Sequence, residues 1–194
     1  RWPECHVPDW WNNEDKNAVE KDLLTYVESV IERYKNNPAL ELWQVENEPF
    51  IKFRFGECSR FNESFVADEI ALARRLDSNH KIIITDSGEL SIWRKAIKAG
   101  DYFGTTLYRV VRRPNGRIWT YDFLPPASYR YKAQIWGQDM ATMFVSELQA
   151  EPWFTSSDPN DTPIEIQEQT MDPKRLQKNF DYVERIGVPR AYLW

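Results

Sequence analysis

Segments of strand length alternate with segments of helix length along this chain, and this alternation constrains the fold more than any other feature. Residues 14–36 carry apolar side chains at intervals of three and four, which predicts a long amphipathic helix. The segment 39–49 is apolar and ends at a proline, which predicts a strand buried on both faces. A helix over 62–76 and a β-branched strand over 81–88 follow. The first half of the chain therefore has the order helix, strand, helix, strand.

The second half continues the same order. The predicted elements are a helix near 89–98, a strand over 102–108, a long loop, a helix near 128–138, a strand over 142–148 and a proline-rich loop. Asp172 and Pro173 fit the cap and the first position of a last helix, and the segment VPRAYLW forms the last strand. Five strands that alternate with helices imply parallel strands joined by right-handed crossovers.

Two architectures have this order, an open doubly wound sheet and part of a closed barrel. An open nucleotide-binding sheet carries a glycine-rich turn, whereas this chain has only seven glycines and no GxGxxG or GxxxxGK[ST] motif. We therefore predict the α/β class and an incomplete (β/α)8 TIM barrel with about five parallel strands. A complete barrel needs about 250 residues. We interpret residues 1–194 as the C-terminal part of one barrel domain whose first three strands are missing.

Charge and cysteine content exclude several classes of partner. The net charge is −5, with 25 basic and 30 acidic residues spread along the chain, so a nucleic-acid partner is not expected. No apolar run is long enough for a membrane span and no signal peptide is visible, which predicts a soluble protein and leaves secretion open. Cys5 and Cys58 are too few for a zinc site; they form either one disulfide or two free buried thiols. No metal and no cofactor are predicted.

In such a barrel the reacting groups lie at the C-terminal ends of the strands. The residues at these positions are Asn47, Glu48, Asp86, Tyr108, Arg109, Glu147 and Trp194. Strand ends across a small barrel mouth aim their side chains toward one point, so Glu48 and Glu147 are expected to form a carboxyl pair. Glu46 lies two residues before Glu48 on the same predicted strand, so it is expected to face the same side and to raise the pKa of Glu48.

Paired carboxylates serve the cleavage of acetals, where one acid protonates the leaving oxygen and one anion attacks or stabilises the sugar carbon. Glu48 is the candidate acid and Glu147 the candidate anion. Asn47 is expected to hydrogen-bond the substrate hydroxyl beside the reacting carbon, and Tyr108 to orient Glu147.

The segments LWQVENEP and FVSELQAEPW resemble clan A of the retaining glycoside hydrolases. The resemblance implies that Glu48 closes the fourth strand of a (β/α)8 barrel as the acid/base and that Glu147 closes the seventh as the nucleophile. It also implies that Trp194 is the aromatic residue at the end of strand eight. The clan often has His-x-Tyr on strand six, whereas this chain has Thr106, Leu107 and Tyr108, so only the tyrosine carries over. The implied activity is cofactor-free hydrolysis of β-linked O-glycosidic bonds in an oligosaccharide or polysaccharide.

Each candidate also has an ordinary interpretation. Glu48 is alternatively a solvated carboxylate at a loop entry, Glu151 rather than Glu147 points into the pocket, and Asp86 caps a helix that starts near Gly88 instead of contacting substrate. His6 is either a partner of a sugar hydroxyl or a hydrogen-bonded loop histidine. Trp2, Trp10, Trp11 and Trp153 either line the cleft or pack in loops, while Trp43 and Trp136 are expected in the core.

Two other functions remain open at this point. One is a non-catalytic carbohydrate-binding protein on a TIM-barrel scaffold, in which the tryptophans hold sugar and the glutamates only hydrogen-bond it. The other is a purely structural fragment. Between the two catalytic stereochemistries, a carboxyl separation of about 5–5.5 Å indicates retention and about 6.5–9.5 Å indicates inversion.

Overall fold

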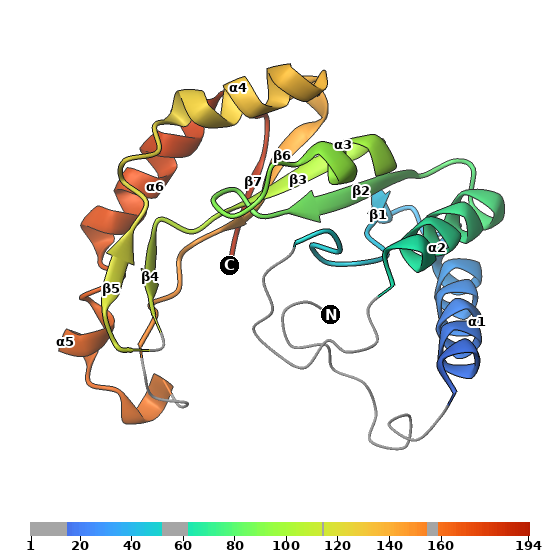
Figure 1. Ribbon diagram of the computed structural model, residues 1–194, viewed down its shortest axis with the longest axis horizontal. Helices are drawn as coiled ribbons and strands as arrows, with labels where there is room; N and C mark the ends of the chain where they lie inside the picture. Colours follow the sequence, from blue (N-terminus) through green and yellow to red (C-terminus); the bar gives the residue numbers. More distant parts are fainter. Residues whose placement is uncertain (1–14, 52–61, 114, 155–158) are drawn as a thin grey trace. The chain divides into compact units, whose positions relative to one another are not determined.

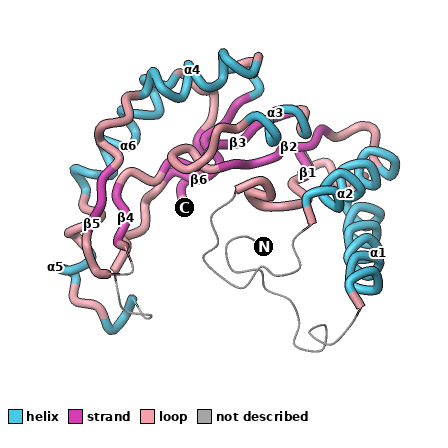
Figure 2. Tube along the Cα trace, viewed as in Figure 1, coloured by secondary structure: helices cyan, strands magenta, loops and turns pink. Residues whose placement is uncertain are grey.

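The computed structural model describes residues 15–51, 62–113, 115–154 and 159–194. The predictions for Trp2, Cys5, His6, Trp10, Trp11 and Cys58 therefore concern residues outside the described ranges. The chain divides into two compact units, residues 1–86 with 94–103 and residues 87–93 with 104–194. Figure 1 labels the elements of both units, and Figure 2 marks helices in cyan and strands in magenta.

One five-stranded sheet contains all five predicted strands in the order β1-β2-β3-β6-β7. These strands are β1 (Leu42–Trp43), β2 (Lys81–Asp86), β3 (Tyr102–Leu107), β6 (Met143–Leu148) and β7 (Ala191–Leu193). The pairs β1–β2 and β6–β7 are parallel. Just beyond the ends of β3 and β6, the backbone N–H of Gln149 donates to the carbonyl of Leu107 at 3.1 Å. The α/β class is confirmed, and the sheet is consistent with part of a barrel.

The first unit is built on two amphipathic helices, α1 (Lys16–Tyr34) and α2 (Glu63–Leu76), with the short helix α3 (Arg94–Ala99). Asn62 caps α2, because its side chain accepts a hydrogen bond from the backbone of Ser64. The side chains of Val66, Ile70 and Ala73 are buried, as the three-and-four spacing predicts.

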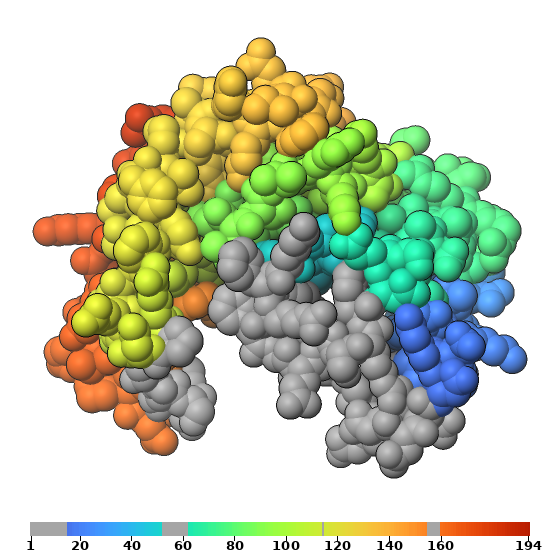
Figure 3. All heavy atoms as spheres, in the orientation of Figure 1, coloured from blue at the N-terminus to red at the C-terminus, as the bar shows by residue number. Residues whose placement is uncertain are grey.

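The second unit is built on α4 (Pro126–Trp136) and α6 (Pro173–Ile186), with the one-turn helix α5 (Ile164–Gln167). Asp172 caps α6 by accepting from the backbone of Arg175, and Pro173 is the first residue of the helix, as the sequence predicts. Tyr129 of α4 packs edge-on against Tyr182 of α6, with 5.8 Å between ring centroids. The opposite side of α4 is open to solvent (Figure 3), and Tyr131 and Ile135 on this helix are exposed.

The segment predicted as a long loop after β3 contains an antiparallel hairpin of β4 (Val110–Arg112) and β5 (Ile118–Thr120). Two strands of three residues each are too short to give a clear alternation in the sequence. The Asn115-Gly116 pair was the available signal, because this dipeptide favours tight hairpin turns and Gly116 has a positive φ of 79°.

Two predicted elements have different bounds in the structure. The strand expected over 39–49 is reduced to Leu42–Trp43, and both residues are only half-buried, so burial on both faces is wrong. Glu48 has a φ of 47°, which takes the backbone out of the extended conformation. The helix expected near 89–98 begins only at Arg94, because Trp93 has a φ of 69° that no α-helix accommodates.

Candidate active site

Asn47 and Glu48 lie in a bend that a threonine of the neighbouring strand holds in place. Thr85 of β2 accepts a hydrogen bond from the backbone N–H of Glu48 at 2.9 Å, and its hydroxyl donates to Asn47 Oδ1 at 3.3 Å. Gln44 Nε2 also donates to Asn47 Oδ1 at 3.1 Å. Glu48 is only 4% exposed, which contradicts the alternative of a solvated loop-entry carboxylate. A short strand and a fixed bend therefore bury this glutamate beside the end of β2.

A second buried carboxyl, which the sequence analysis did not select, lies in the same unit. Glu69 of α2 is 1% exposed, and its Oε2 has no hydrogen-bond partner among the described residues. Burial raises the pKa of Glu69 to about 8, and the charge of Glu46 adds to the rise. Burial also raises the pKa of Glu46. The signal for Glu69 was its place in the apolar stripe of the helix, three residues after Val66.

The expected strand geometry of Glu46 is wrong, because β1 ends at Trp43 and Glu46 follows it in a bend. An alternation of faces therefore does not relate Glu46 to Glu48, and the effect of Glu46 on the pKa of Glu48 stays a prediction. Asp86 is buried at the end of β2, but the helix that it was expected to cap near Gly88 is not there, since α3 begins at Arg94.

In the second unit, Glu147 lies at the penultimate position of β6 and is held by Tyr108. The Tyr108 hydroxyl donates to Glu147 Oε2 at 3.0 Å, which is the contact that the sequence predicts. The ring of Trp153 packs against that of Tyr108, with centroids 5.6 Å apart. Trp153 Nε1 donates to Glu151 Oε1 at 3.0 Å. Of the two alternative acids, Glu147 is thus the one that Tyr108 contacts, whereas Glu151 is bound by a tryptophan.

Trp194 follows β7 and lies beside the end of β6. The backbone N–H of Trp194 donates to the carbonyl of Leu148 at 3.0 Å, and the backbone carbonyl of Trp194 accepts from the N–H of Ala150 at 3.0 Å. Trp194 is 47% exposed, so part of its indole is open to contacts outside this unit. Trp43 and Trp136 are half-buried rather than deep in the core, and Trp43 Nε1 donates to Asp77 Oδ2 at 2.9 Å.

Another buried carboxyl, also missed by the sequence analysis, lies behind Tyr108. The side chain of Glu89 is 2% exposed, and its Oε1 lies 3.6 Å from NH1 of Arg109. The Tyr129 hydroxyl donates to the same oxygen, and the backbone N–H of Tyr108 donates to the carboxylate. Burial raises the pKa of Glu89 to about 7, although these donors and the guanidinium oppose the rise. Glu89 lies in a loop, where apolar residues do not recur at regular intervals, so the sequence pattern does not indicate that it is buried.

Arg109, one of the strand-end candidates, is buried among groups of the second unit. Its guanidinium lies 4.3 Å from the centre of the Tyr182 ring and donates to the carbonyl of Leu124 at 2.9 Å and to that of Tyr121. Its side chain is as deeply buried as that of Glu89. Arg109 therefore neutralises charge inside the second unit, which is a structural role.

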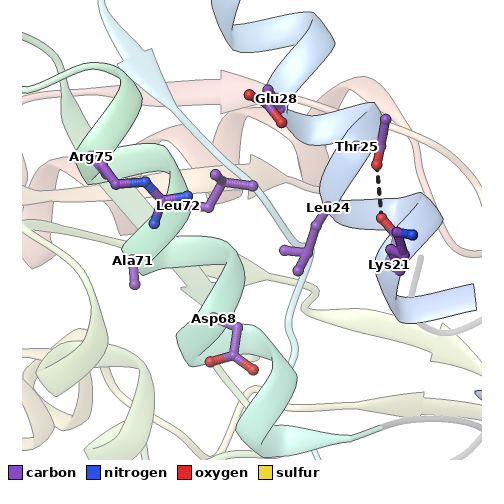
Figure 4. A pocket seen from close by; sticks show the side chains of 8 residues that line it. All are labelled: Lys21, Leu24, Thr25, Glu28, Asp68, Ala71, Leu72 and Arg75. Atoms are coloured by element: carbon purple, nitrogen blue, oxygen red, sulfur yellow. Dashed lines mark hydrogen bonds between the residues drawn. The ribbon is translucent and has the colours of Figure 1, made fainter. Parts of the chain in front are cut away.

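A pocket of about 380 Å³ opens between α1 and α2 (Figure 4). Lys21, Glu28, Asp68 and Arg75 line it together with apolar side chains such as Leu24. None of the predicted site residues that the structure describes lines this pocket. Within the described ranges, no group of three His, Cys, Asp or Glu side chains is arranged to hold a metal ion, and no helix has the length and apolar character of a membrane span.

Comparisons with known proteins give partial matches to glycosidases. No model of a known protein family matches the sequence. The chain is 29% identical over 80 residues to mannan endo-1,4-beta-mannosidase F of Aspergillus clavatus, which covers 41% of this chain and 17% of that protein. It is 32% identical over 81 residues to the probable mannan endo-1,4-beta-mannosidase F of Aspergillus flavus, covering 41% and 16%. The match thus spans less than a fifth of the length of these curated relatives.

Solved structures resemble the fold over almost the whole chain. Bacteroides uniformis beta-glucuronidase 2, covalently bound to cyclophellitol-6-carboxylate aziridine, matches with a TM-score of 0.59 at 16% identity, over 97% of this chain and 22% of that chain. A putative beta-galactosidase from Bacteroides fragilis matches with a TM-score of 0.55 at 12% identity, over 90% and 25%. At these identities the likeness concerns the fold. The chain is therefore similar to one part of larger glycoside hydrolases.

Proposed function

We propose that this chain carries the reacting carboxylates of a retaining glycoside hydrolase that cleaves β-linked O-glycosidic bonds in an oligosaccharide or polysaccharide. The observation that carries the proposal is the Tyr108–Glu147 hydrogen bond of 3.0 Å at the end of β6. The fixed bend that buries Glu48 after β1 supports it from the other unit. Glu147 lies near the C-terminal end of β6 and Glu48 in the bend after β1, and folds of this class carry their reacting groups after or at the C-terminal ends of strands.

In the first step Glu147 attacks the anomeric carbon while Glu48 gives its proton to the leaving oxygen. The bond between Glu147 and the sugar forms as the glycosidic C–O bond breaks, and the aglycone departs as an alcohol. In the second step Glu48 takes a proton from water, whose oxygen replaces Glu147 on the sugar. Atoms and charge balance over the two steps without any cofactor.

The supporting residues have roles that follow from their contacts. Tyr108 holds one oxygen of Glu147, so the carboxylate keeps a single orientation toward the sugar carbon. Asn47, fixed by Thr85 and Gln44, is proposed to hydrogen-bond the hydroxyl beside the reacting carbon. Trp153 and Trp194 are proposed to stack on the apolar faces of sugar rings.

The relatives support this reaction class. The two Aspergillus proteins are named as endo-1,4-beta-mannosidases. The Bacteroides uniformis protein is covalently bound to an aziridine, and such an adduct requires a nucleophile on that enzyme. The names of all these proteins are those of β-glycosidases. We therefore propose a β-linked pyranoside as the substrate class of this chain.

The test uses the complete protein and a panel of aryl β-glycosides that includes the mannoside, glucuronide and galactoside. We expect Glu48→Gln and Glu147→Gln each to lower kcat by about 10²–10⁴-fold. Glu151→Gln is the matched control, because Glu151 lies in the loop after β6 and is bound by Trp153, and it is expected to keep turnover within about threefold. Full turnover by either of the first two variants would contradict the proposal.

Two further results separate the proposal from its rivals. NMR of the first product sugar is expected to show the β-anomer, whereas the α-anomer means inversion. A coordinate set with sugar bound is expected to place the carboxyl groups of Glu48 and Glu147 about 5–5.5 Å apart. Binding of the whole glycoside panel without turnover identifies a non-catalytic carbohydrate-binding protein.

A further inference from the structure

We propose that Glu89 is a positioning residue that fixes the backbone of Tyr108 and, through the Tyr108 hydroxyl, the orientation of Glu147. The inference rests on the proposed function, because Glu147 must be the nucleophile for its orientation to matter. The Glu89 carboxylate accepts from the Tyr108 N–H, and the Tyr108 hydroxyl donates to Glu147 Oε2 at 3.0 Å, so Tyr108 links the two carboxylates.

Three groups converge on the Glu89 carboxylate. The Tyr108 N–H and the Tyr129 hydroxyl donate to it, and NH1 of Arg109 lies 3.6 Å from Oε1. The Arg109 NH1 atom is buried and has no hydrogen-bond partner among the described residues, so the Glu89 charge is the group that compensates it. Such an arrangement suits an ionised carboxylate, since an amide would turn N–H groups toward donors.

The other charged and titratable groups around Glu89 come from the elements packed against it. Lys132 of α4 and Arg109 act on Glu89 as positive charges, while the Glu89 charge acts on Tyr121, Tyr129 and Tyr182. Glu89 therefore interacts with two cations, and its charge acts on three tyrosine hydroxyls.

Tyr108 is held on both sides of its backbone. Glu89 accepts from the Tyr108 N–H, while Gln149 Oε1 accepts from the next two N–H groups, those of Arg109 and Val110, each at 3.0 Å. Gln149 is in turn fixed by Asn179, whose Nδ2 donates to its carbonyl at 2.8 Å. The backbone around Tyr108 is thus held by hydrogen bonds, its ring packs on Trp153, and its hydroxyl donates to Glu147.

The loop that carries Glu89 has little freedom to swing. The N–H of Gly88 donates to Thr106 Oγ1 at 3.3 Å, and Lys132 Nζ donates to the carbonyls of Gly88 and Ser91. A Cβ on Gly88 would lie 2.1 Å from the carbonyl oxygen of Thr106, so no larger residue fits there. The indole of Trp93 closes the loop by donating to the carbonyl of Ser87 at 2.8 Å.

The test measures kcat and KM for Glu89→Gln in the complete protein. We expect kcat to fall by about tenfold to a hundredfold, since small displacements of reacting groups cost that much, with KM changed by no more than about twofold. Glu184→Gln, an exposed change on α6 of the same unit, is the control and is expected to leave both constants unchanged. A parallel fall in both variants, or no fall in Glu89→Gln, overturns the inference.

The decisive readout is the coupling between Glu89 and Tyr108. If Glu89 acts through Tyr108, the double variant Glu89→Gln/Tyr108→Phe is expected to be no more than about twofold slower than Tyr108→Phe alone. Multiplication of the two single effects would mean that Glu89 acts by another route, and the inference would be wrong. If Glu89 had only a structural role, Glu89→Gln would lower the amount of folded enzyme. Its effect would then also multiply with that of Tyr108→Phe in the double variant.

A milder variant covers the possibility that Glu89→Gln does not fold. Tyr129→Phe removes only the hydroxyl that donates to Glu89 and leaves the ring packing on Trp93 and Tyr182. We expect kcat to fall by about threefold to tenfold and to show the same lack of additivity with Tyr108→Phe. Additive effects overturn the inference here as well. Failure of the proposed function can be told apart from failure of this inference. If the proposed function is wrong, Glu147→Gln remains active, whatever the effect of Glu89→Gln.

Discussion

Glu69 in the first unit and Glu89 in the second are equally buried, yet their surroundings have opposite electrostatic character. Glu69 has an oxygen without a hydrogen-bond partner among the described residues and a second carboxylate, Glu46, as its charged neighbour. Glu89 receives two hydrogen bonds and lies beside the guanidinium of Arg109. Burial raises the pKa of both, to about 8 for Glu69 and to about 7 for Glu89.

The difference shows what each buried acid can do. An acid with a pKa of about 8 is mainly protonated at pH 7, so Glu69 is a neutral group in the wall of the first unit. An acid surrounded by donors serves as a fixed acceptor, so Glu89 organises the chain around Tyr108. Burial alone therefore does not define the role of a carboxyl group; the charge and the donors of its neighbours do.

The largest effect is expected from Arg109→Met, which leaves Glu89 buried without its cation. Loss of one partner of a buried ion pair costs about 3–5 kcal/mol, and we expect the free energy of unfolding to fall by that amount. Urea unfolding at pH 9 measures it, because at pH 7 a carboxyl with a pKa of about 7 is about half protonated and avoids the penalty by binding a proton. Adding Glu89→Gln to the same chain is expected to restore part of the loss, because the uncompensated charge is then gone. A stable Arg109→Met variant would contradict the claim that Arg109 compensates the buried charge of Glu89.

A smaller effect of opposite sign is expected from Glu69→Gln. The folded pKa of Glu69 is raised from 4.5 to about 8, so the folded state holds this proton more tightly than the unfolded state. The stability that this provides is complete below about pH 4.5 and is lost as the pH rises through 8. The Gln variant has no such loss, and we expect it to be more stable than the parent by about 1–2 kcal/mol at pH 8, after the cost of the buried amide.

Unfolding of this variant and the parent across pH 5 to 9 checks the sign. The difference between them is expected to grow as the pH rises, whereas a constant or shrinking difference would show that Glu69 is ionised in the folded protein. That result would remove the contrast between the two units.

The smallest effect is expected from Lys178→Met, which breaks an exposed ion pair of the second unit. Lys178 Nζ lies 3.1 Å from Asp122 Oδ1, and the two side chains are 56% and 40% exposed. Such a pair contributes about 0.2–1 kcal/mol, and we expect a loss near the lower limit in 0.15 M salt. A loss of stability as large as that of Arg109→Met would mean that burial does not make the Arg109–Glu89 pair more stabilising than the exposed Lys178–Asp122 pair.

Much of the fold could be predicted from the sequence, because it depends on periodic burial. Four of the five strands lie close to their predicted bounds, whereas β1 is reduced to Leu42–Trp43, and Asp172 caps α6 as predicted. The spacing of apolar residues does not predict where the backbone departs from helix or strand conformation. Glu48 has a positive φ in the bend that follows β1, and Trp93 has a positive φ directly before α3; neither residue type announces such a conformation.

The candidate site could be predicted only in its strand-end part. Glu147 lies near the end of β6 and Tyr108 directly after β3, as the strand pattern predicts, and the Tyr108 hydroxyl donates to Glu147. Glu48 lies in a bend five residues after β1. Glu69 and Glu89 could not be ranked in the same way, because burial of a polar side chain depends on contacts across the fold. For Glu89 these contacts lie 19, 20 and 40 residues away in sequence, at Tyr108, Arg109 and Tyr129.

Glu147 is the group that we propose to form the covalent bond to sugar, and trapping of that bond tests the proposal most directly. The complete protein is incubated with an activated 2-deoxy-2-fluoro β-glycoside that it turns over, digested, and analysed by mass spectrometry for the labelled peptide. We expect one sugar per chain, attached to Glu147, and no label in Glu147→Gln. A label on Glu151 or on any other residue, or hydrolysis of the parent glycoside without a covalent intermediate, would contradict the account.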